Sequence, residues 1–149
     1  ITTSFAEECD ADLFNEAAVV WGAVPEILIA GYDVLVEAGI SEEVAYMECV
    51  GELKLLSELI EARGLAGMRE VISNTAELGG VLGGPTVIGA DVRARMLGVL
   101  GSVKSGEFAR SLRDEARAGY PRLREARASA RSASVEKSFE RLRSLAEEG

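Results

Sequence analysis

The 149-residue sequence contains no histidine, only two cysteines and three prolines, and few aromatic side chains. Without histidine, the chain lacks the commonest proton shuttle near neutral pH and the usual protein ligand of zinc. Any catalysis must therefore use carboxylates, hydroxyl groups or a metal-bound water. Cys9 and Cys49 could form at most one disulfide, so we expect two reduced thiols rather than a secreted, disulfide-built scaffold.

Basic residues are scarce in the first part of the chain. Residues 1–88 hold 3 Lys and Arg against 16 Asp and Glu, whereas residues 89–149 hold 13 against 9. An acidic half repels nucleic acid and anionic membrane surfaces, and it suits cations or a basic partner. No stretch approaches the ~18 uninterrupted apolar residues of a membrane span, and no signal peptide pattern is present. We expect a cytoplasmic protein that binds neither nucleic acid nor membranes.

The apolar pattern along the chain is mostly helical, and no convincing strand pair appears, which predicts one all-α domain over residues 1–149. A glycine-rich connection, "GGVLGGP", covers 79–85; it lacks the Lys-Ser/Thr ending of a phosphate-binding loop. The first expected helix begins near Asp10 or Asp12 and is kinked at Pro25. About five helices are predicted, at residues 10–39, 42–64, 65–78, 90–117 and 121–147.

Two of these helices carry acidic pairs at a spacing of four residues. Asp12 and Glu16 lie in "DADLFNE", and Glu48 and Glu52 lie in "AYMECVGELKLL". This spacing places the two carboxylates of each pair one above the other on a helix, and burying them unpaired among apolar neighbours is costly. Magnesium prefers hard oxygen ligands, so four carboxylates could hold two Mg²⁺ ions.

The acidic pairs also have a simpler interpretation. In a chain with 25 acidic residues, pairs four positions apart arise by chance, and Asp33 with Glu37 is another example. Spacing alone therefore leaves open a solvated acidic face.

The residue sequence of three segments is more informative than the spacing of their acidic residues. "EECDADLFNE" (7–16), "AYMECVGELKLL" (45–56) and "GLAGMREVISNTAELG" (64–79) resemble, in the same order and at similar separations, the C-terminal domain of ketol-acid reductoisomerase. The segments "FARSLRDEARAG" (108–119) and, more weakly, "VEKSFERLRSL" (135–145) extend the resemblance over almost the whole chain.

The resemblance implies a knotted or interwoven helical domain that forms an intertwined homodimer with a shared active site. It implies an enzyme of branched-chain amino acid synthesis, which converts 2-acetohydroxy acids to 2,3-dihydroxy acids by magnesium-dependent alkyl migration and reduction with NADPH. Asp12 and Glu16 match the first-helix metal ligands, and Asp12 is expected to bridge both ions. Glu48 and Glu52 match acids that reach the site from the partner subunit. Ser73 matches a serine that contacts substrate, and Glu52 and Asp12 are the expected catalytic residues.

The sequence departs from the family pattern close to these positions, for example at Met47, Gly51, Leu78 and Gly80. The family's nicotinamide-binding domain, with its glycine-rich fingerprint, has no counterpart in the 149 residues. NADPH is therefore expected to bind a separate domain, in cis or in trans, and the chain alone could perform at most the isomerisation.

Two alternatives to this enzyme remain open at the level of the sequence. The chain could be a non-catalytic helical dimerisation module that keeps the fold without turnover. It could also be a stand-alone metal-dependent isomerase or lyase that acts on another oxygen-rich acid.

Overall fold

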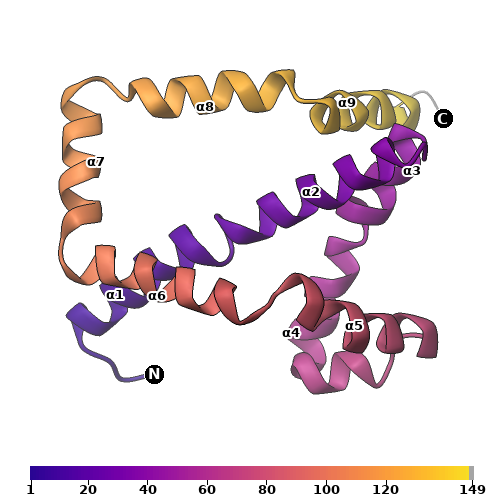
Figure 1. The fold of residues 1–149 in the computed structure, drawn as a ribbon, viewed down its shortest axis with the longest axis horizontal. Helices are drawn as coiled ribbons and strands as arrows, with labels where there is room; N and C mark the ends of the chain where they lie inside the picture. Colours follow the sequence, from indigo (N-terminus) through magenta and orange to yellow (C-terminus); the bar gives the residue numbers. More distant parts are fainter. Residues whose placement is uncertain (148–149) are drawn as a thin grey trace.

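The computed structural model describes residues 1–147, which fold into nine α-helices and one π-helical turn without any strand (Figure 1). The predicted all-α class is confirmed. In chain order the elements are α1 (Phe5–Ala18), α2 (Ala23–Glu37), α3 (Glu42–Tyr46), η1 (Met47–Gly51), α4 (Leu53–Arg69), α5 (Asn74–Val87), α6 (Ala90–Lys104), α7 (Glu107–Arg117), α8 (Pro121–Ser132) and α9 (Ser134–Glu147).

The first predicted helix is two helices, and its expected start was wrong. Ser4 caps α1 because its hydroxyl accepts a hydrogen bond from the amide of Glu7 at 3.2 Å. Pro25 does not kink a continuous helix, since it lies in the first turn of α2, where backbone amides have no partner within the helix. The predicted end at Gly39 is confirmed, with a φ of +88° just after α2.

The remaining boundaries also differ from the prediction. The expected helix 42–64 is α3, η1 and α4, and α4 continues past a kink at Gly64 to Arg69. The expected helix 65–78 does not exist as such, because Ser73 starts a new helix and the glycine-rich run lies inside α5. The helices expected at 90–117 and 121–147 are each divided in two, near Gly106 and Ala133.

The described chain has a very small core of its own. Only a few side chains are buried, and many large apolar ones are exposed, among them Trp21, Leu82 and Val87. The helices form an open frame in which α1 packs on α6, while α3 packs on α2 and α9 (Figure 1). Exposed apolar patches of this extent are typical of surfaces that another protein surface covers.

A closed ring of hydrogen bonds joins α2, α3 and α9. The hydroxyl of Tyr32 contacts the hydroxyls of Ser134 and Ser138, each at 2.9 Å. Ser134 donates to Glu42 at 3.0 Å, and Arg141 closes the ring by donating to Glu42 and to Ser138. Tyr32 and Ser138 are fully buried. The hydrogen bond from Arg141 lowers the pKa of Glu42, so this carboxyl is ionised in the ring.

The stretch Phe5–Glu37, which covers α1 and α2, is long and apolar enough to cross a membrane by length and composition alone, with a mean hydropathy of 1.6. Only 6% of its most apolar part is buried in the single chain. A core helix of a water-soluble protein has the same composition. Glu26 and Asp33 lie within the stretch, and a carboxylate at the centre of a bilayer costs about 2.5–3.5 kcal/mol. These charges favour a protein surface as the cover of α1 and α2.

Candidate active site

The first acidic pair lies on α1. Asp12 and Glu16 are four residues apart on this continuous helix, so the predicted stacking of the two carboxylates is confirmed. Both side chains are exposed, and neither is ion-paired within residues 1–147. The pair therefore faces outward from the single chain and is available to a cation or to another molecule.

The second acidic pair lies on a π-helical turn. Glu48 is within η1, and Glu52 follows directly after it, with its amide bonded to the carbonyl of Met47 at 3.2 Å. Such five-residue turns are rare and are often found at functional sites. Lys54 points away, as expected, because it pairs with Glu58 at 3.8 Å. Glu48 and Glu52 are exposed, and neither forms an ion pair with a basic side chain among the described residues.

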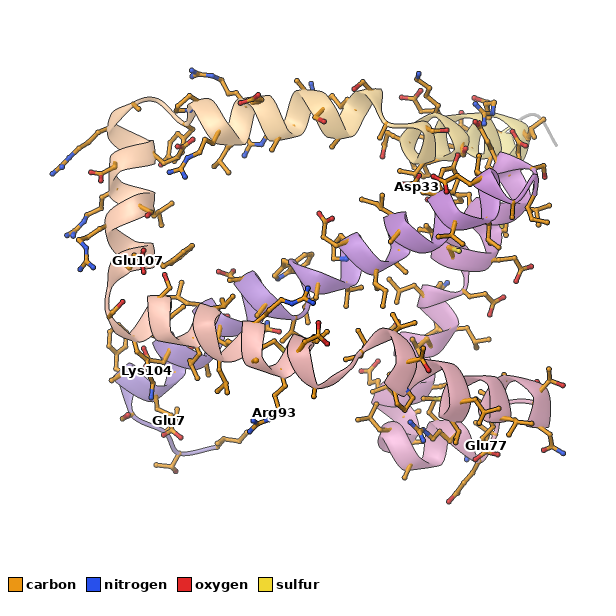
Figure 2. All side chains as sticks on the ribbon, viewed as in Figure 1. Glu7, Asp33, Glu77, Arg93, Lys104 and Glu107 are labelled. Carbon is orange, nitrogen blue, oxygen red and sulfur yellow. The ribbon has the colours of Figure 1, made fainter. Side chains whose placement is uncertain are left out.

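The expectation that these four carboxylates are buried was wrong for the single chain. All four are exposed, so their repulsion is screened by water and burial alone does not require an ion. Within the described part of the chain, no group of three or more His, Cys, Asp and Glu is placed to hold a metal. The two pairs lie apart: α1 lies at the left of the frame in Figure 1, whereas η1, which joins α3 to α4, lies at its right (side chains in Figure 2).

The structure does bring together Glu52 and Ser73. Both line a hollow of about 430 Å³ at the junction of α4 and α5, together with mainly apolar side chains such as Leu55, Leu59 and Ile72. Ser73 is positioned because it caps α5, with its hydroxyl accepting from the amide of Ala76 at 3.1 Å. A carboxylate, a hydroxyl and an apolar wall in one small hollow fit a small organic molecule with both oxygen atoms and an alkyl group.

The lining of this hollow has a signal in the sequence that the prediction did not use. Glu52, Leu55, Leu59 and Arg63 are separated by three, four and four residues, so they form one stripe along α4. The remaining lining residues come from the turn before α5, and this tertiary contact has no signal in the local pattern.

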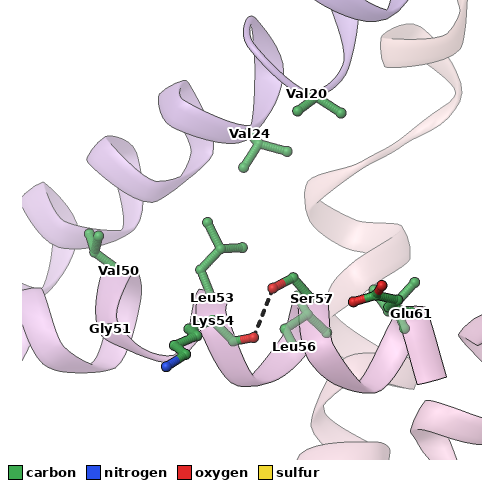
Figure 3. Close-up of a pocket in the computed structure, with 10 residues that line it drawn as sticks. Val20, Val24, Val50, Gly51, Leu53, Lys54, Leu56, Ser57 and Glu61 are labelled. Atoms are coloured by element: carbon green, nitrogen blue, oxygen red, sulfur yellow. Dashed lines mark hydrogen bonds between the residues drawn. The ribbon is translucent and has the colours of Figure 1, made fainter. Parts of the chain in front are cut away.

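A second, larger hollow lies between α2 and α4. It has a volume of about 830 Å³ and is lined mostly by apolar side chains, including Val20, Val24, Leu53 and Leu56 (Figure 3). It adjoins the acidic pair of η1, since Val50 and Gly51 also line it. An open groove of this size and character is suited to packing against an apolar element of another chain.

Both thiols are free, as expected. Cys9 and Cys49 form no disulfide in the described structure. Cys49 lies close to α2, and burial raises the pKa of its thiol, with the neighbouring Glu48 carboxylate adding to the effect. A raised pKa makes Cys49 a poor nucleophile and indicates a structural thiol.

Residues 5–148 match the family model described as "Ketol-acid reductoisomerase, C-terminal domain". The chain belongs to this family. A ketol-acid reductoisomerase (NADP(+)) of Corynebacterium urealyticum is 43% identical over 145 residues, which are 97% of this chain and 43% of the relative. The solved NADH-preferring ketol-acid reductoisomerase from an uncultured archean is 40% identical, has a TM-score of 0.93, and matches over 96% of this chain and 43% of its own.

The family comparison confirms the resemblance read from the three motifs and the all-helical fold. The chain spans less than half the length of the relatives, so it corresponds to one part of a ketol-acid reductoisomerase. The two relatives differ in the nicotinamide cofactor that their names give.

Proposed function

We propose that this chain is the substrate- and metal-binding part of a ketol-acid reductoisomerase that acts on 2-acetohydroxy acids. The observation that carries the proposal is that Glu52 and Ser73, 21 residues apart in sequence, line one small and largely apolar hollow in a chain of this family. A 2-acetohydroxy acid carries a carboxylate, a hydroxyl, a carbonyl and a short alkyl group. The hollow offers polar atoms to the first three and an apolar wall to the last.

The chemistry of the acidic side chains fits magnesium. Asp12, Glu16, Glu48 and Glu52 are hard oxygen donors, and the chain has no histidine to favour zinc or iron. One chain does not gather these donors, because α1 and η1 lie apart (Figure 1). We therefore assign the α1 pair of one chain and the η1 pair of a second chain to one site, which would hold two Mg²⁺ ions.

A second copy is also the proposed cover of the exposed apolar surface. The groove between α2 and α4 adjoins η1, so a chain seated there lies next to Glu48 and Glu52. A homodimer that interlaces through the open helical frame would bury this groove and bring the second chain's α1 to it.

The roles of the chain's own residues follow from their chemistry. When bound, magnesium would polarise the substrate carbonyl and acidify its hydroxyl. Glu52 would accept and return the hydroxyl proton, and Asp12 would be a carboxylate ligand of the metal. Ser73 would orient the substrate by a hydrogen bond. Reduction with NADPH requires a nicotinamide-binding part that these residues do not include. We place the whole enzyme in the cytoplasm, in the synthesis of branched-chain amino acids.

Subunit complementation tests this proposal sharply. In the full-length protein, Asp12→Asn and Glu48→Gln should each abolish magnesium-dependent turnover of a 2-acetohydroxy acid. Co-expression of the two variants should restore part of it, because a mixed dimer contains one site with intact donors from both chains. Asp33→Asn is the matched control, since Asp33 also belongs to an exposed acidic pair but lies on α2.

Each outcome decides between the alternatives. Failure of complementation would show that the site is not shared between chains. Unchanged turnover in both single variants would refute the proposed metal site. If magnesium does not stabilise the wild-type protein, a non-catalytic dimerisation module is favoured. Conversion of another acid without nicotinamide would favour a stand-alone isomerase or lyase.

A further inference from the structure

One lining residue of the Glu52 and Ser73 hollow has no role in the function proposed above. Arg63 lies on the same stripe of α4, one helical turn beyond Leu59. Its place is fixed by the backbone, because α4 kinks directly after it at Gly64, where φ is +68°. The kink brings Gly67 so close that a side chain there would meet the Cβ of Arg63 at 2.8 Å.

The charge around Arg63 is unusual for this half of the molecule. Residues 1–88 contain only three basic side chains, and one of them, Lys54, is paired with Glu58. Among the described residues, Arg63 has no ion pair and no side-chain hydrogen bond, although acidic side chains outnumber basic ones several-fold in this half. Arg63 is an exposed side chain at the wall of the hollow that Glu52 and Ser73 also line, and its unpaired guanidinium is available to an anion bound there.

We propose that Arg63 is a specificity-determining residue that binds the carboxylate of the substrate in this hollow. The guanidinium presents a planar fork of donors that matches a carboxylate, and such charge-assisted pairs are stronger than neutral hydrogen bonds. A carboxylate has about four lone-pair positions, so it can meet Arg63 and a metal ion together. Leu55, Leu59 and Val71 would face the alkyl end, and Arg63 would offset the repulsion between an anionic substrate and the acidic half of the chain.

This inference rests on the proposed function, and its test separates the two. The full-length protein with magnesium is titrated with a 2-acetohydroxy acid and, in parallel, with the methyl ester of that acid, which has lost the negative charge. Arg63→Met keeps an unbranched apolar stem but removes the guanidinium and its charge, whereas Arg63→Lys keeps the charge but loses the fork. Arg69→Met is the matched control, since Arg69 also lies on α4 but does not line the hollow.

Arg63→Met should weaken binding of the acid about 10- to 100-fold and leave binding of the ester and of magnesium unchanged. Arg63→Lys should give an intermediate loss, and Arg69→Met should bind as the wild type does. Equal affinity of wild type and Arg63→Met for the acid would overturn the role of Arg63 while leaving the proposed function intact. A wild-type protein that binds neither acid nor ester with magnesium present would overturn both.

Discussion

The hydrogen-bond ring around Tyr32 leads to a quantitative prediction, because its side chains come from three helices, α2, α3 and α9. Tyr32→Phe removes one hydroxyl and the two hydrogen bonds of 2.9 Å to Ser134 and Ser138. Neither serine is left without a partner, since Ser134 still donates to Glu42 and Ser138 to the carbonyl of Ser134. The loss is therefore the net value of the hydrogen bonds, about 1 to 2 kcal/mol, rather than a full desolvation penalty.

This loss should lower the melting temperature by about 2 to 8 °C for a chain of this length. Thermal denaturation followed by circular dichroism measures it, with protomer concentration held constant because association contributes to stability. Tyr120→Phe is the control, since the hydroxyl of Tyr120 forms no hydrogen bond among the residues described. Its melting temperature should equal that of the wild type.

A double-mutant cycle makes the prediction sharper. Tyr32→Phe combined with Ser138→Ala removes both partners of one hydrogen bond, so the double variant should lose about 1 kcal/mol less than the sum of the single variants. Strict additivity, or a Tyr32→Phe protein as stable as Tyr120→Phe, would refute the view that this ring holds α9 against α2 and α3.

Three further predictions concern the local structure. Gly31→Ala places a Cβ 3.2 Å from the Sγ of Cys49, and this tight contact should cancel the gain in helix propensity of about 1 kcal/mol, so the variant should melt no higher than the wild type and adding Cys49→Ala should raise its melting temperature. The hydrogen bond from Arg122 lowers the pKa of Glu115 below its usual 4.5, so the ionised Glu115 stabilises the fold above that pH and this effect disappears as the pH falls through the folded pKa. On acidification, the melting temperature of Glu115→Gln should therefore fall less than that of the wild type, and an equal fall would contradict this. Ser73→Ala should cost about 1 kcal/mol by removing the cap of α5, whereas Ser73→Asn should keep the cap and the melting temperature but weaken substrate binding, and unchanged binding would leave Ser73 a capping role only.

Some features of the site follow from residue spacing along the chain, whereas others depend on tertiary packing. The stacking of Asp12 with Glu16 followed from helical spacing, which depends only on residues four apart. The shared hollow of Glu52 and Ser73 depends instead on the kink at Gly64 and on the new helix that Ser73 begins. Gly64 and Ser73 are both visible in the sequence, but the positive φ of Gly64 and the direction in which the chain leaves these two residues are set by packing.

The sequence by itself determined the all-helical class, the two acidic pairs, the free thiols and the family to which the chain belongs. These properties follow from periodicity, composition and short motifs, which are local. Only the tertiary structure decided that nine α-helices replace the five expected within residues 1–147, that η1 is a π-helical turn, and that all four carboxylates are exposed and divided between separate regions. The physical reason is that burial depends on what packs against a helix face, and in the described chain many large apolar side chains have nothing packed over them.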